Sequence, residues 1–87
     1  MLYKLPDGTE VEYRVLTLKD AVAVVNDTSD DPAMFREAIR RAVTKPNHTL
    51  ERLARLPDAA EQIEFLAMEI LLAALRAQAS ATRETSP

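Results

Sequence analysis

Residues 59–79, AAEQIEFLAMEILLAALRAQA, decide the fold because they form the longest helix that the sequence predicts. Asp58 and Glu61 make a capping-box pattern at its start, and the stretch contains neither proline nor glycine. One apolar stripe has the spacing of an ordinary core face and consists of Ile63, Leu66, Ala67, Ile70, Leu71 and Ala74. The second stripe, displaced around the same helix, consists of Phe65, Met68, Leu72, Leu75 and Ala79.

The second stripe gives this helix more apolar surface than a small domain buries easily. A helix that is apolar nearly all round must be buried nearly all round, and 87 residues leave few other helices to surround it. In one reading the short helices fold over both stripes. In the other, which we favour, the second stripe meets another chain. Burying one large apolar side chain is worth ~1.5–3 kcal/mol, so four exposed ones forfeit several kcal/mol and favour aggregation.

Three shorter helices are predicted before this one. The first covers Leu18–Val25 with Thr17 as its N-cap, and packing must hold it because valine is a poor helix former. The second covers Pro32–Thr44, with Asp31 as its cap and Pro32 at the first helical position. The third covers Thr49–Leu56 and ends at a proline. The apolar face of the first helix consists of Leu18, Val22 and Val25, and that of the second of Phe35, Ala38, Ile39, Ala42 and Val43.

The N-terminal residues predict a β-hairpin. Leu2–Leu5 and Glu10–Leu16 are strand-like, and the Pro-Asp-Gly-Thr sequence between them favours a turn. Alternation in the second strand places Val11, Tyr13 and Val15 on one face. An isolated hairpin is marginal in water, so helices must cover that face. We therefore predict an α+β, mostly α fold, in which an N-terminal β-hairpin is followed by three to four helices, the last one longest.

From Ser80 onward the residues are mostly polar and small. We therefore predict a single domain over residues 1–79, followed by a disordered tail over residues 80–87. The chain has no cysteine, so disulfides and thiolate metal sites are excluded, and His48 alone supplies too few ligands for zinc. A small domain without these supports depends on self-association or on a partner. We therefore expect a homo-oligomer or a protein complex.

No catalytic or cofactor motif is present. The single glycine, Gly8, belongs to the turn, so no glycine-rich phosphate loop exists, and no nucleophile stands in a histidine motif. We expect no enzyme activity, no cofactor and no metal. The apolar runs fall short of the ~18 residues of a membrane span, and the N-terminus lacks the pattern of a signal peptide. We expect a cytoplasmic location and no membrane contact.

A basic face on the 32–44 helix is the only signal for nucleic acid. It consists of Arg36, Arg40 and Arg41. Basic helix faces can contact phosphates. However, Glu37 interrupts the face and the chain has a net charge of -3, so we interpret it as solvated. A small nucleic-acid-binding regulator stays an alternative function, and nucleic acid is not the partner we expect.

Two short segments carry a family resemblance. Asp7–Val11, DGTEV, and Leu16–Asp20, LTLKD, resemble the opening of phage tail assembly chaperones and related small tail or baseplate proteins, where a hairpin leads into a helix. The resemblance covers the first half of the chain and implies a non-catalytic protein of the host cytoplasm. Such chaperones coat the helical tape-measure protein until tube subunits replace them. No binding residue of the family matches by motif, so the second stripe is nominated on physical grounds alone.

The resemblance and the second stripe together predict a tail assembly chaperone. It would bind an apolar helical partner, the tape-measure protein, through its C-terminal helix. The alternative is a permanent structural component of a phage tail or baseplate, in which the same stripe is buried in a fixed assembly and stays in the virion.

Overall fold

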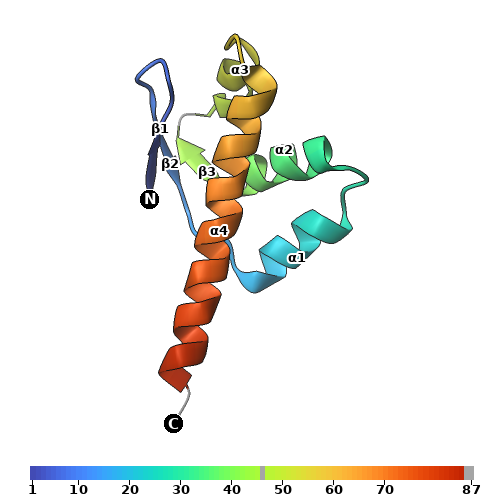
Figure 1. Cartoon of the computed structure of the whole chain (residues 1–87), viewed down its shortest axis with the longest axis vertical. Coiled ribbons are helices and arrows are strands. Elements are labelled where there is room, and N and C mark those ends of the chain that lie inside the picture. The colour runs from blue at the N-terminus through green and yellow to red at the C-terminus, as the bar shows by residue number, and fades with distance from the viewer. Residues whose placement is uncertain (46, 86–87) are drawn as a thin grey trace.

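The computed structural model describes residues 1–45 and 47–85, and the side chains of residues 1–45 and 47–79. An N-terminal hairpin precedes helices of which the last is the longest, so the predicted fold class is confirmed (Figure 1). The described elements are β1 (Leu2–Lys4), β2 (Glu10–Tyr13), α1 (Leu18–Asn26), α2 (Asp31–Ala42), β3 (Val43–Lys45), α3 (Thr49–Ala54) and α4 (Ala59–Thr85).

The β1–β2 hairpin is antiparallel and closes through the predicted turn. Gly8 donates its backbone N–H to the Leu5 carbonyl at 2.9 Å, and its φ of 90° lies in the left-handed region that favours glycine. The Asp7 carboxylate accepts a hydrogen bond from the Thr9 N–H at 2.9 Å. Asp7 and Gly8 therefore supply the hydrogen bond and the backbone conformation that the turn prediction requires.

The third strand was not predicted. The helix expected over Pro32–Thr44 ends at Ala42, and Val43–Lys45 pairs antiparallel with β2. Val43 and Thr44 are β-branched, and such residues favour strands. They come directly before a lysine-proline pair, and proline disfavours the α conformation of the residue that precedes it. The Thr44 hydroxyl also donates to the Glu12 carbonyl at 3.1 Å. The helical prediction for these last residues is therefore wrong.

Two local predictions near the helix starts need correction. The N-cap of α2 is Asp30, whose carboxylate accepts from the Ala33 N–H at 2.9 Å, and Asp31 is the first helical residue. Val15 is exposed and Leu16 is buried, because β2 ends at Tyr13 and the strand alternation does not continue to Val15. The cap of α1 agrees with the prediction, since the Thr17 hydroxyl accepts from the Asp20 N–H at 3.1 Å.

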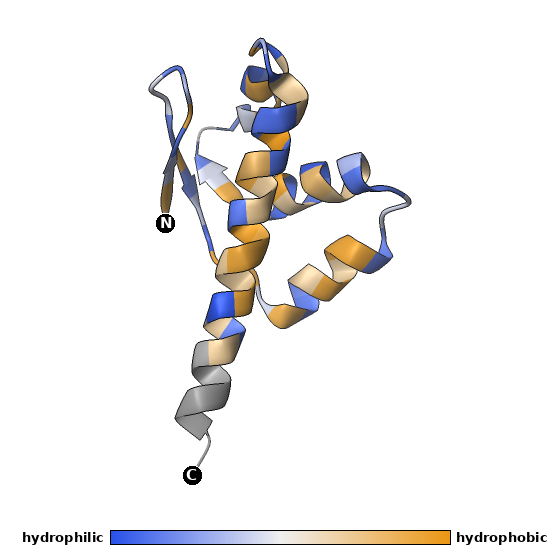
Figure 2. Ribbon diagram, viewed as in Figure 1, coloured by the Kyte–Doolittle hydropathy of each residue, from blue (hydrophilic) through white to orange (hydrophobic). Residues whose placement is uncertain are grey.

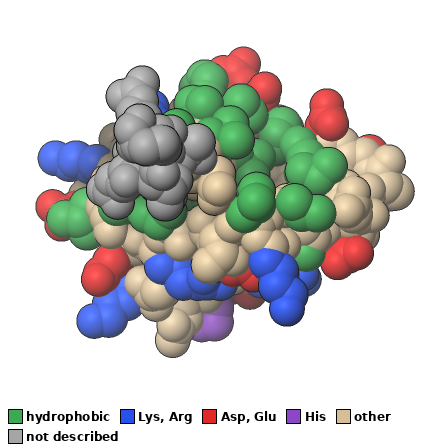
Figure 3. All heavy atoms as spheres, turned by 90° about the horizontal axis from the view of Figure 1, so that it is seen from below, with side chains coloured by type: hydrophobic (Ala, Val, Ile, Leu, Met, Phe, Trp, Pro, Cys, Tyr) green, Lys and Arg blue, Asp and Glu red, His purple; other side chains and the backbone are tan. Residues whose placement is uncertain are grey.

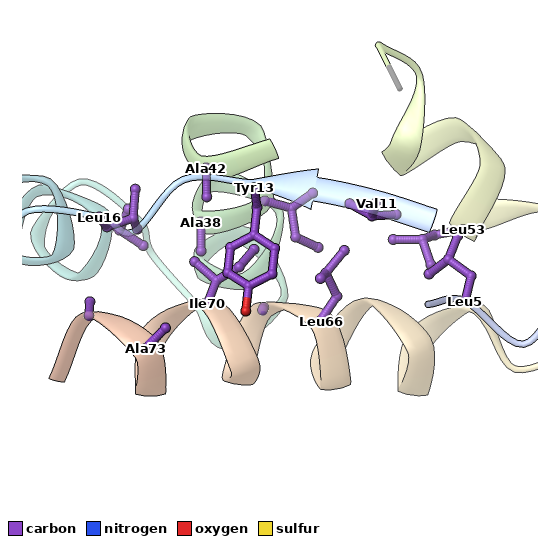
Figure 4. Close-up of a cluster of buried hydrophobic side chains, with 14 residues drawn as sticks. Leu5, Val11, Tyr13, Leu16, Ala38, Ala42, Leu53, Leu66, Ile70 and Ala73 are labelled. Carbon is purple, nitrogen blue, oxygen red and sulfur yellow. The ribbon is translucent and has the colours of Figure 1, made fainter. Parts of the chain in front are cut away.

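The core lies between α4 and the remaining elements. Figure 4 shows Leu66 and Ile70 of α4 directed toward Tyr13 of β2 and Ala38 of α2, and Leu53 of α3 belongs to the same cluster. The hairpin and the other helices therefore pack against α4, as the core stripe predicts.

The backbone of α4 remains helical to Thr85, beyond the end expected near Ala79. The side chains of residues 80–87, and the backbone of residues 86 and 87, lie outside the described part, so the disordered tail predicted for residues 80–87 stays a prediction. Among the described helices, none combines the length and hydropathy needed to cross a lipid bilayer.

Candidate functional site

The second stripe lies on the solvent side of α4. The exposed fractions are 52% for Phe65, 40% for Met68, 40% for Leu72 and 62% for Leu75, and Ala79 is also exposed. These residues are spaced alternately three and four apart, so they share one side of the helix, roughly opposite the buried Leu66 and Ile70. The reading in which the short helices fold over both stripes is therefore wrong in this structure.

A second exposed apolar face belongs to α1. The exposed fractions are 55% for Leu18, 49% for Val22 and 56% for Val25, and we call these three residues the α1 face. We expected them to pack inward, but α1 packs with Val24 toward the core instead. The sequence could not decide between the two sides of this helix, because apolar residues occur on both sides and the two charged residues, Lys19 and Asp20, are adjacent in the sequence and lie on different sides.

The two faces belong to one side of the molecule. Figure 2 shows hydrophobic segments along both α1 and α4, which contact each other. Figure 3 shows hydrophobic side chains gathered in a band on one face of the molecule. We call the second stripe and the α1 face together the apolar surface. It is the candidate site, and sequence reasoning found only the α4 half of it.

An ion network fixes the position of α1. The Asp20 carboxylate of α1 lies 3.1 Å from Arg14 Nη1 and 3.5 Å from Arg41 Nη1 of α2. Arg14 Nε also donates to the Arg41 carbonyl at 3.1 Å. The hydrogen bond from Arg14 is the main reason that the pKa of Asp20 is lowered. These contacts join α1 to the segment after the hairpin and to α2, and the burial of Val24 in the core leaves the α1 face exposed.

The basic face on α2 is partly neutralised. Arg41 Nε donates to Glu37 Oε1 at 2.9 Å, and this hydrogen bond is the main reason that the pKa of Arg41 is raised. Arg40 Nη1 lies 3.7 Å from the other carboxylate oxygen of Glu37. Two of the three arginines therefore already have carboxylate partners. This arrangement weakens the nucleic-acid alternative, which needs guanidinium groups available to phosphates.

The described residues offer little other chemistry. Within residues 1–45 and 47–79, no three side chains of His, Asp or Glu come together in a way that could hold a metal ion. A hollow of about 180 Å³ lies between the N-terminal ends of α2 and α4, where Phe35 and Ile63 meet Arg36 and Glu64. It is small for a ligand site, since ligand pockets usually measure ~300–1,000 Å³. Two open hollows of about 390 and 460 Å³ reach that range. Both are lined by His48 and Glu51, and neither contains a residue of the apolar surface.

No protein-family model, curated protein or solved structure matches this chain. The family resemblance of the N-terminal segments therefore stays a prediction, and the geometry of the apolar surface is the main basis for a functional proposal.

Proposed function

We propose that the protein is a non-catalytic phage tail assembly chaperone, which binds an apolar helical segment of a tape-measure protein and keeps that protein soluble. The exposure of the second stripe carries the proposal. Four large apolar side chains and Ala79 form a line along α4 that the other described side chains, in residues 1–45 and 47–79, leave exposed. Exposed apolar patches on a monomer mark interaction sites or aggregation hazards, and a chaperone of this kind needs such a site.

The spacing of the second stripe suits a helical partner. Helices pack through side chains spaced three and four residues apart, and Phe65, Met68, Leu72 and Leu75 have this spacing. A helix that lies along them covers its own apolar stripe at the same time. An otherwise insoluble helix gains a polar exterior from the chaperone, whose other surfaces carry most of its charge.

The resemblance of Asp7–Val11 and Leu16–Asp20 to tail chaperones supports the phage setting. The proposed location is accordingly the host cytoplasm. A permanent tail or baseplate component would use the same surface, but it would remain in the finished particle. Mass spectrometry of purified particles separates the two roles, because a chaperone should be absent from them.

The direct test is co-expression with a tape-measure protein. We expect the partner to become soluble with the wild-type chain and to stay insoluble with Leu72→Glu, which places a charge in the second stripe. Ala77→Glu is the matched control, since Ala77 is exposed on the same helix and lies outside the stripe. If the partner is equally insoluble with and without the wild-type chain, the proposed function is wrong.

A further inference from the structure

We infer that the α1 face and the second stripe are two walls of one docking site, which receives a single amphipathic helix whose apolar stripe is flanked by lysine and arginine. This inference rests on the proposed function for its setting. It adds α1 to the site and states the chemistry of the partner.

The geometry supports two walls. Leu18, Val22 and Val25 are spaced four and three residues apart, so α1 presents a line of apolar side chains, as α4 does. The two helices contact each other and diverge from their contact in Figure 1. Figure 3 shows one band of hydrophobic side chains on this side of the molecule. A helix placed against this band would touch both lines, and its apolar face must therefore be wide.

The charges beside α4 favour a basic partner. Glu61 lies one turn before Phe65 in the line of the second stripe, and Glu64 lies one turn before Met68. Within the described part of the chain, neither glutamate takes part in an ion pair. Arg76 is the one cation among the α4 residues up to Ala79, whose side chains the structure describes, and it lies 3.7 Å from Glu69, which offsets its charge. In Figure 3 acidic side chains border the hydrophobic band, and the lysine and arginine side chains gather mostly on the lower side of the view.

This charge pattern argues for a different chain over a second copy. A second copy would bring more glutamates to the same border, and like charges across an interface suppress association. The whole chain also has a net charge of -3. Lysine or arginine beside the apolar stripe of the partner would instead lie opposite Glu61 and Glu64. The occupant that fits this surface is therefore a helix with basic flanks.

The test uses two labelled peptides and the full-length protein. Each peptide is roughly 20 residues long, which suffices for a helix, and has leucines at a spacing of three and four. One peptide has lysine at the remaining positions and the other has glutamate. Fluorescence anisotropy at moderate salt should show the lysine peptide binding at least about tenfold tighter. Equal affinity for the two peptides would overturn the charge argument.

Single substitutions test the two walls. Val22→Glu on α1 and Leu72→Glu on α4 should each reduce affinity for the lysine peptide at least about tenfold. Both changes make the protein more acidic, so non-specific attraction to lysine would strengthen binding. The control Ala77→Glu adds the same charge and should retain affinity. Circular dichroism verifies folding, and Val25→Glu replaces Val22→Glu if the latter unfolds.

Other results of these experiments would show which part of the inference is wrong. Wild-type affinity in a folded α1 variant would remove α1 from the site. A homodimer in light scattering that Leu72→Glu dissociates would show that a second copy is the occupant, which refutes the inference. The proposed function fails separately, because the peptide results can hold even if the co-expressed tape-measure protein remains insoluble.

Discussion

Ile39 and Leu72 should respond in opposite ways to the same substitution. Ile39 of α2 is 1% exposed in the core against α4. Ile39→Glu removes ~1.5–3 kcal/mol of burial and places a carboxylate where its desolvation costs several kcal/mol more. The free energy of unfolding of an 87-residue chain is about 4–13 kcal/mol. The cost of Ile39→Glu is comparable to this free energy and removes most or all of it. We expect Ile39→Glu to be unfolded.

Leu72→Glu should leave the domain folded. Because Leu72 is 40% exposed, the new carboxylate can remain in water, and the loss is limited to the buried part of the leucine, about 1–2 kcal/mol. Far-UV circular dichroism and urea unfolding measure both variants. A cooperative transition at somewhat lower urea is expected for Leu72→Glu, beside a nearly unchanged one for Ala77→Glu. If Leu72→Glu unfolds as completely as Ile39→Glu, the solvent side of α4 is a buried face and the candidate site does not exist.

Three further variants test local features. Gly8→Ala should lower the urea midpoint by the equivalent of roughly 1–2 kcal/mol, because the added Cβ meets no atom within 4 Å and the cost arises from the φ of 90° alone. Stability should decline as the pH falls below about 4, because the hydrogen bond from Arg14 holds the pKa of Asp20 below its usual 3.8 and the unfolded chain takes up the proton first. Urea unfolding of Asp20→Asn should show a smaller decline over this acid range. Burial raises the pKa of Tyr13 above 10.0, so stability should also decline as the pH rises through 10, and Tyr13→Phe should lessen that alkaline decline in the same assay.

Local chemistry was the part of the fold that could be predicted. The turn around Gly8 and the cap at Thr17 depend on neighbouring residues, and the start of α4 follows a break at Pro57. The α4 helix was predictable because its core stripe repeats over many turns, so the period is clear even though a second apolar stripe shares the helix.

The parts that failed depend on distant contacts. The apolar period of the 32–44 helix continues through Val43, and pairing with β2 adds to the local preference of Val43 and Thr44 for a strand. The orientation of α1 depends on distant contacts, in which Val24 enters the core and Asp20 meets Arg14, just after β2, and Arg41 of α2. Such an ion network cannot be read from the residues of α1 alone, so the α1 face was assigned to the core.

The side chains of the apolar surface are only partly exposed, and this bears on whether the surface suits a chaperone or a permanent tail component. Its seven large side chains are 40–62% exposed, so each has already gained part of its burial energy within the lone chain. Covering the remainder yields about 5–10 kcal/mol in total at half of ~1.5–3 kcal/mol each. Association itself costs an estimated 4–15 kcal/mol, so one domain should hold one helix only weakly.

Weak single contacts become strong when several copies line one long partner, and they still allow copies to be displaced one at a time. A permanent subunit needs the larger interface of an obligate complex, typically ~2,000 Å² or more. The apolar surface is thus better matched to a reversible helper of a long helix than to a fixed part of a particle.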